Sequence, residues 1–223
     1  YFGRPLGEPV PTERRRLTEF RGRLGLLIEY GLGTTMDSIL HEDYGASLRL
    51  SFVVNQQFPD FYLRGGGGAI LLRLDCKALH DESAEYSARF ELSRSRIDPA
   101  RDFLLYIAWK WKRGTLGGTE LTYPHVEEGL VVPAIEIADE RDLHLAARGG
   151  SFLDDGTPVV PPLMNVDTNF GKINRIVHGS RQYADLSPHI KRFVDFSKRH
   201  ADSVARAESA PEPTVTPDEA NPI

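Results

Sequence analysis

Apolar side chains recur at two different spacings along the chain, and each spacing predicts a type of element. Between residues 13 and 29 they recur every three or four positions, which predicts an amphipathic helix that Gly31 and Gly33 terminate. A short second helix is expected over residues 35–40. Further helices are predicted for the segments 83–96, 172–186 and 188–207.

β-Branched and aromatic residues are concentrated in five other segments, which we predict to be strands: 48–57, 59–64, 69–79, 102–112 and 130–138. The four glycines of residues 65–68 separate the second strand from the third, so these two are expected to form an antiparallel hairpin. The mixture predicts an α/β (α+β) fold in which helices flank a central mixed β-sheet.

The length of 223 residues and the 40% content of hydrophobic residues suit one domain with a tail. We expect an irregular lead-in over residues 1–12, a single domain over 13–207, and a disordered, proline-rich acidic tail over 208–223. The single cysteine, Cys76, excludes an internal disulfide framework and a cysteine-based zinc site.

No apolar run is long enough to span a membrane, and the N-terminus lacks the layout of a signal peptide. We therefore expect a cytoplasmic protein with no membrane partner. The net charge of −5 and the pI of about 5.8 give no overall signature of a nucleic-acid-binding protein.

Asp75 and Lys77 are predicted to share one face of the third strand, because side chains alternate between faces along a strand. Asp60 opens the partner strand, and the hairpin could bring it beside Asp75. Two close carboxylates repel each other, and a divalent cation relieves the repulsion. Oxygen ligands suit Mg²⁺, and a nearby lysine could orient an attacking water, so the set is typical of phosphodiester hydrolysis.

Pro59-Asp60, fourteen intervening residues and then Asp75-Cys76-Lys77 resemble the signature of the PD-(D/E)xK nuclease superfamily, which includes many restriction endonucleases. The resemblance covers the hairpin closely and residues 13–112 loosely. It implies a restriction-endonuclease-like core and an Mg²⁺-dependent endonuclease that cleaves DNA in restriction or defence, with Mn²⁺ as a possible substitute.

By position in the motif, the resemblance makes Asp60 and Asp75 metal ligands together with the main-chain carbonyl of Cys76, and it places Lys77 on the attacking water. Many members add an acidic residue from the preceding helix. Glu29 is the best-placed candidate for that role in this chain, and Glu42 is the second.

The expected partner is double-stranded DNA, and a homodimer or a partner subunit is compatible with a symmetric target. Basic side chains on the predicted strands and helices are the candidate phosphate contacts: Lys110, Lys112, Arg113, Arg73 and Arg89. Residues 114–171 exceed the minimal core and form a possible substrate-recognition extension, followed by C-terminal helices over 172–207. The tryptophans beside Lys110 are expected in the core.

Three other interpretations are compatible with the same residues. Asp75 and Lys77 could form an ordinary ion pair on a half-exposed strand. The chain could be a catalytically inactive nucleic-acid-binding or assembly module on the nuclease fold. It could also be an unrelated α+β interaction protein, in which case Asp60 and Asp75 should lie far apart with no shared cavity.

Overall fold

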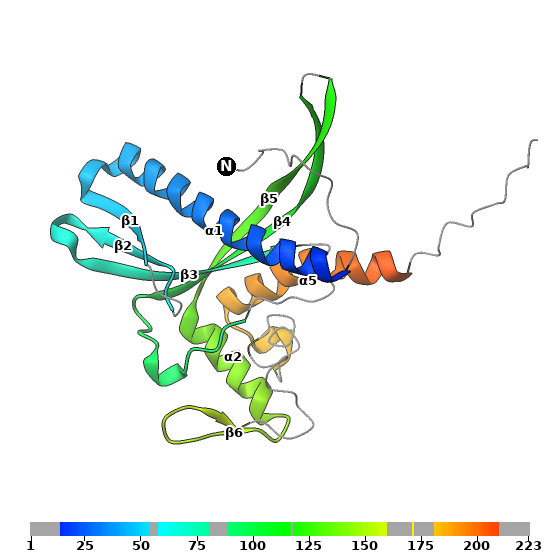
Figure 1. Ribbon diagram of the computed structural model, residues 1–223. Coiled ribbons are helices and arrows are strands. Elements are labelled where there is room, and N and C mark those ends of the chain that lie inside the picture. The colour runs from blue at the N-terminus through cyan, green and yellow to red at the C-terminus, as the bar shows by residue number, and fades with distance from the viewer. Residues whose placement is uncertain are drawn as a thin grey trace, which may run out of the picture.

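The computed structural model describes residues 14–53, 58–80, 89–116, 118–159, 171 and 181–209 (Figure 1). Its sheet contains β1 (Leu48–Phe52), β2 (Phe61–Gly65), β3 (Ile70–His80), β4 (Asp102–Leu116) and β5 (Thr119–Pro133). The helices are α1 (Arg14–Tyr44), α2 (Ala134–Ala146) and α5 (Pro188–Ser209), and a small hairpin consists of β6 (Ser151–Phe152) and β7 (Pro158–Val159).

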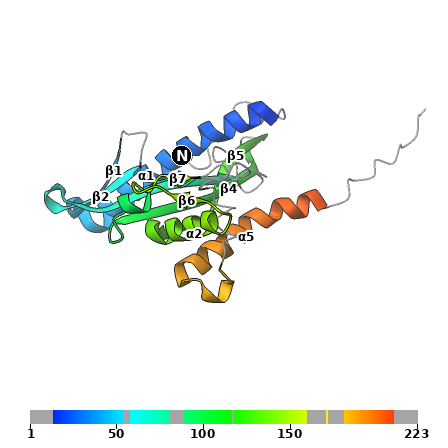
Figure 2. The ribbon, with the colours of Figure 1, turned by 90° about the horizontal axis from the view of Figure 1, so that it is seen from below.

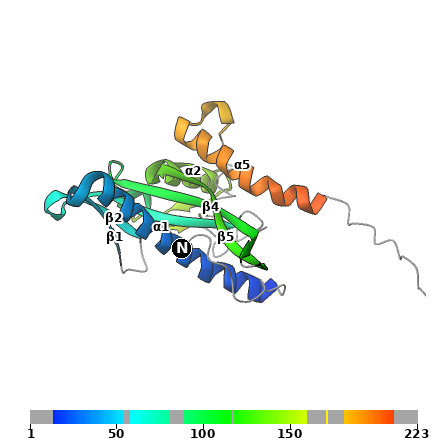
Figure 3. The same ribbon diagram turned by 90° about the horizontal axis from the view of Figure 1, so that it is seen from above.

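The five strands lie in the order β1-β2-β3-β4-β5, and only the β3–β4 pair is parallel. Helix α1 covers one face of this mixed sheet, and α2 and α5 cover the other (Figures 2 and 3). The predicted α/β class, with helices on both sides of a central mixed sheet, is therefore confirmed. The predicted antiparallel pairing of the two strands around the glycine turn is also confirmed.

Helix α1 is one continuous helix, so the prediction of a break at the glycines followed by a second helix was wrong. The reason is a tertiary contact. A Cβ atom on Gly33 would lie 2.3 Å from Cε1 of Phe61, so glycine permits the helix to approach β2 closely. A Cβ atom on Gly25, two turns earlier, would make only an ordinary contact of 3.7 Å with the Cβ of Ala78.

Each face of the sheet has its own buried cluster. The cluster under α1 contains Leu24, Ile28, Phe61, Leu74, Cys76, Leu105, Ile107 and Trp109. The cluster under α2 and α5 contains side chains from β3, β4 and β5, including Leu79, Leu104, Tyr106 and Val132, together with Ile137, Phe193 and Phe196. The alternation of side chains along β3 and β4 therefore divides the apolar residues between two layers. The expected core position of Trp109 is confirmed.

The prediction of a strand over 130–138 was wrong beyond Pro133. That residue ends β5 and directly precedes α2, whose buried Ile137, Arg141 and Leu145 recur at helical spacing. The proline forfeits no helical hydrogen bond at this boundary. Strand β5 begins at Thr119, so residues 119–129 belong to the central sheet and are not part of a separate extension.

Two predicted helices are absent from the parts of their segments that the structure describes. Residues 89–96 contain only the short 3₁₀ turn Arg94–Arg96, and residues 181–186 contain only the turn Tyr183–Asp185. The helix predicted over 188–207 is confirmed as α5. The lead-in over 1–12 and nearly all of the tail over 208–223 lie outside the described residues. Among the described helices, none has the length and apolarity needed to cross a bilayer.

Candidate active site

Asp60 and Asp75 lie opposite each other where β2 ends. The last pair of the β2–β3 register joins Phe61 to Leu74, so one further step places Asp60 across from Asp75. The backbone continues this pairing, because the Asp60 N–H donates to the Leu74 carbonyl at 3.0 Å. The two aspartates are therefore not far apart, as an unrelated interaction protein with a coincidental motif would have them.

Beyond this point no described strand pairs with this edge of β3, and carboxylate oxygens accept hydrogen bonds from its backbone N–H groups. The Cys76 N–H donates to Asp60 Oδ2 at 2.7 Å, and the Ala78 N–H donates to Glu29 Oε1 of α1 at 3.1 Å. An edge strand presents alternate residues whose N–H and C=O groups point outward together. The Cys76 carbonyl therefore faces the same edge as its N–H group, beside Asp60.

Asp75 and Lys77 share the opposite face of β3 from Cys76, as the alternation predicts. Lys77 Nζ lies 2.6 Å from Asp75 Oδ2. Only 7% of the Asp75 side chain and 21% of the Lys77 side chain are exposed, so this is not a surface ion pair. The short distance and the burial of both groups make this a charge-assisted contact inside the protein.

Burial and the neighbouring negative charges raise the pKa values of two carboxyl groups at this site, those of Asp75 and Glu29. Burial raises the pKa of Asp75 to about 6; the Lys77 ammonium opposes this shift and the neighbouring Asp60 adds to it. Burial likewise raises the pKa of Glu29 to about 7, against the hydrogen bond from Ala78. Burial lowers the pKa of Lys77, but the carboxylates of Asp75, Asp60 and Glu29 together outweigh burial, so the pKa is raised on balance and Lys77 stays an ammonium.

Asp60, Asp75 and Lys77 open into one cleft of about 760 Å³. Its remaining lining comes from the segment before β2, the segment before β4 and the turn between β6 and β7: Phe58, Arg89, Phe90, Glu91, Leu92, Ser93, Arg96, Asp155, Gly156, Thr157 and Pro158. A volume of this size is typical of substrate sites. Charged groups with raised pKa values in a cleft are a common feature of catalytic centres.

The donor set of the site fits Mg²⁺ by type. Asp60 and Asp75 supply carboxylate oxygens, and the Cys76 carbonyl adds a third hard ligand at the same edge. Among the described residues, no three His, Cys, Asp or Glu side chains are placed to hold a metal ion by themselves. A cation would therefore complete its shell with water and substrate oxygens, which is the usual mode of Mg²⁺ binding.

The other predicted site residues, Glu29, Glu42 and Cys76, lie in different surroundings. Neither Glu29 nor Glu42 is among the described residues that line the cleft. Glu29 accepts the Ala78 N–H at this edge of β3 and interacts electrostatically with Asp60, Lys77 and Asp75, whereas Glu42 is exposed near the end of α1. The Cys76 side chain is buried in the cluster under α1. Burial raises the pKa of its thiol, so this side chain is neither a metal ligand nor a nucleophile.

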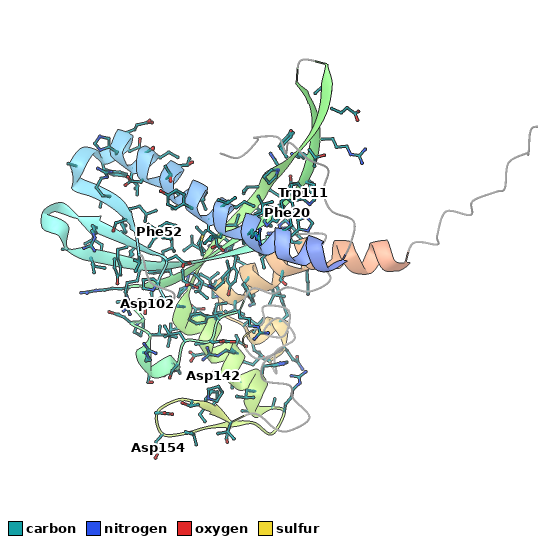
Figure 4. All side chains as sticks on the ribbon, viewed as in Figure 1. Phe20, Phe52, Asp102, Trp111, Asp142 and Asp154 are labelled. Carbon is teal, nitrogen blue, oxygen red and sulfur yellow. The ribbon has the colours of Figure 1, made fainter. Side chains whose placement is uncertain are left out.

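The predicted phosphate contacts differ in what they already bind. Arg73 forms a bidentate pair with the buried Asp102, at 2.5 and 2.6 Å, at the start of β4 (Figure 4). Lys110 and Lys112 lie 2.7 and 3.3 Å from Glu127 on the adjacent strand.

Arg89 lines the cleft and lies 3.4 Å from Glu91, and Arg113 is exposed on the arm where β4 and β5 project beyond the rest of the sheet (Figure 1). Of the five predicted contacts, only Arg89 lines the cleft.

Sequence reasoning missed the far parts of the cleft. Asp155, Gly156 and Thr157 belong to a segment that the sequence predicts only as a loop, and their turn signal does not reveal which residues they face. Phe58 also lines the cleft without any motif to mark it. Comparison of the chain with protein-family models, curated proteins and solved structures found no match.

Proposed function

We propose that this protein is an Mg²⁺-dependent endonuclease that hydrolyses DNA phosphodiester bonds, on a core of the restriction-endonuclease type. One observation carries the proposal: Asp60 and Asp75 lie in register at an open strand edge, with Lys77 2.6 Å from Asp75, in a single cleft. A structural ion pair does not require a second carboxylate at the end of the neighbouring strand. A role in restriction or defence follows from the family resemblance.

Asp60, Asp75 and the Cys76 carbonyl would hold the metal ion. When bound, Mg²⁺ supplies charge stabilisation to the scissile phosphate and lowers the pKa of a water molecule. The two aspartates would act as oxygen ligands whose positions are fixed by the backbone of β2 and β3. Relief of their repulsion is part of the free energy of binding, because burial and Asp60 disfavour the ionised form of Asp75.

Lys77 acts through its charge. Its raised pKa keeps the ammonium protonated at neutral pH, so it orients the attacking water by donating hydrogen bonds and stabilises negative charge on the phosphate. Glu29, with a pKa of about 7, is the group at this edge that can accept a proton near neutral pH. Its Oε1 is occupied by the Ala78 N–H, which leaves Oε2 for that proton.

The test is cleavage of supercoiled plasmid and phage DNA in Mg²⁺, in Mn²⁺ and in EDTA. Wild type is compared with Asp75→Asn and Lys77→Ala, and Asp43→Asn, an exposed position on α1, is the matched control. Metal-dependent cutting by wild type and the control, with loss in both site variants, is expected. Loss of a group that acts in the transition state costs about two to four orders of magnitude in rate.

Two results would contradict the proposal. Cutting that survives in both site variants would mean that a contaminant or a different site is responsible. Binding of DNA by the folded wild type with no cutting in either metal would favour the inactive binding module. Circular dichroism of every variant shows whether a loss of activity is a loss of fold.

A further inference from the structure

The described lining of the cleft includes three cationic side chains, which differ in what they already contact. Lys77 is paired with Asp75 at 2.6 Å, and Arg89 lies 3.4 Å from Glu91. Arg96 is exposed, and within the described part of the chain its guanidinium has neither an ion pair nor a hydrogen bond. It is the cation of the cleft that is still available to an incoming anion.

The charge of the cleft makes this availability important. Among the described residues, its lining contains four carboxylates, on Asp60, Asp75, Glu91 and Asp155, against the three cations. Over this described part of the lining, a phosphodiester chain meets a net negative surface until a divalent cation is bound. A single uncommitted arginine then contributes a large share of the attraction, because guanidinium groups pair with phosphate in bidentate geometry.

Arg96 stands on a rigid part of the fold. The Arg96 N–H donates to the Ser93 carbonyl at 2.9 Å, and the Ile97 N–H donates to the Arg94 carbonyl at 3.2 Å, which closes the 3₁₀ turn. The buried Ile97 anchors one side of this turn. Arg94 anchors the other through Asp139 of α2, with Nε 2.5 Å from Oδ1.

The small β6–β7 hairpin holds the same turn from outside. A Cβ atom on Gly156 would lie 2.1 Å from Oγ of Ser93, so the hairpin packs directly against the residues that precede Arg96. The Thr157 N–H donates to Oδ1 of Asp155 at 2.9 Å, which fixes the orientation of this carboxylate at the tip of the hairpin. Figure 4 labels Asp154 at the tip of this hairpin, which forms the outer part of the cleft wall.

We infer that Arg96 is a substrate-positioning residue, which binds a phosphate of the nucleic acid next to the one at the Asp60–Asp75 edge. The inference rests on the proposed function for the nature of the substrate. Arg94, two residues earlier, makes no such contact because its guanidinium is held by Asp139 outside the cleft lining. Arg94 and Arg96 therefore provide a matched comparison within one 3₁₀ turn.

The experiment measures binding of a short labelled oligonucleotide by fluorescence anisotropy in Mg²⁺, over a range of KCl concentrations. Lys77→Ala serves as the background, because it keeps both aspartates while suppressing cleavage. Arg96→Ala, Arg96→Lys and Arg94→Ala are added to it. The slope of log K against log salt is negative, and loss of one phosphate contact reduces its magnitude by about 0.9 for a duplex or about 0.7 for a single strand.

Arg96→Ala should reduce the slope by that amount and Arg96→Lys should restore most of it, whereas Arg94→Ala leaves it unchanged. Cleavage by the single variant Arg96→Ala, made without Lys77→Ala, should show a raised KM with a nearly unchanged kcat. Equal slopes for Arg96→Ala and Arg94→Ala would overturn the inference. Absence of binding to the oligonucleotide, tested both as a single strand and as a duplex, would overturn it as well. Arg96-dependent binding by a wild type that never cuts would refute the proposed nuclease and leave the inference standing.

Discussion

Glu29 offers a quantitative test of the electrostatics of the site. Its pKa is about 7 in the folded protein against an ordinary value of 4.5, because burial disfavours the carboxylate. A carboxyl group whose pKa is raised by folding favours the native state below the unfolded pKa, and this contribution is lost as the pH rises through the folded pKa. Ionisation of Glu29 should therefore destabilise the protein progressively between about pH 4.5 and pH 7.

The magnitude follows from the two values. Their difference corresponds to about 3 kcal/mol at about 1.4 kcal/mol per pH unit. Glu29→Gln removes the charge, and its amide oxygen can still accept the Ala78 N–H. The variant should unfold like wild type near pH 4.5 and should gain up to about 3 kcal/mol over wild type at pH 8.

The assay is urea unfolding without divalent cations, at several pH values from 4.5 to 8, followed by circular dichroism. Glu42→Gln, at an exposed position of the same helix, is the control and should show no pH-dependent gain. A difference between Glu29→Gln and wild type that stays constant across this range would refute the reasoning. It would mean that favourable contacts in the native state offset the cost of burying the ionised Glu29 carboxylate, and that folding does not raise its pKa.

Three further predictions concern packing, ion pairing and metal. Gly33→Ala should lower stability by about 1–3 kcal/mol through overlap with the Phe61 ring, whereas Gly25→Ala should be neutral or stabilising in the same thermal melts. Arg73→Ala should cost about 3 kcal/mol in urea unfolding because it leaves a fully buried carboxylate unpaired, and Arg49→Ala, at an exposed pair, should cost little. Mg²⁺ at about a hundredfold its Kd should stabilise wild type by about 2.7 kcal/mol and leave Asp75→Asn unchanged.

The local sequence pattern was sufficient to predict that Asp60, Asp75 and Lys77 lie together, but not which other residues line the cleft. The period of two along β3 and the glycine turn before it dictate that Asp75 and Lys77 share a face and that Asp60 returns toward them. These two features depend on neighbours in sequence, which is why they could be derived without a structure. The pairing register had to be assumed, because it also depends on the irregularity between Leu63 and Arg64, which the sequence does not reveal.

The missed features depend on contacts between distant parts of the chain. Gly33 signals a helix end by composition, but its role is set by Phe61, which lies 28 residues later. The role of Arg73 was likewise hidden, because Asp102 is 29 residues away and the pair forms only when β3 and β4 align in parallel. Sequence alone could not distinguish Arg96 from Arg94, since their difference comes from Asp139 on α2.

The most direct test of the cation site is a calorimetric titration of Mg²⁺ and Mn²⁺ into the wild type, Asp60→Asn, Asp75→Asn and the control Asp43→Asn. The account predicts a site in wild type and in the control that is lost in both aspartate variants, while all four proteins remain folded. Equal metal binding by all four proteins, or no binding by any of them, would contradict the claim that the edge of β3 holds a catalytic metal ion.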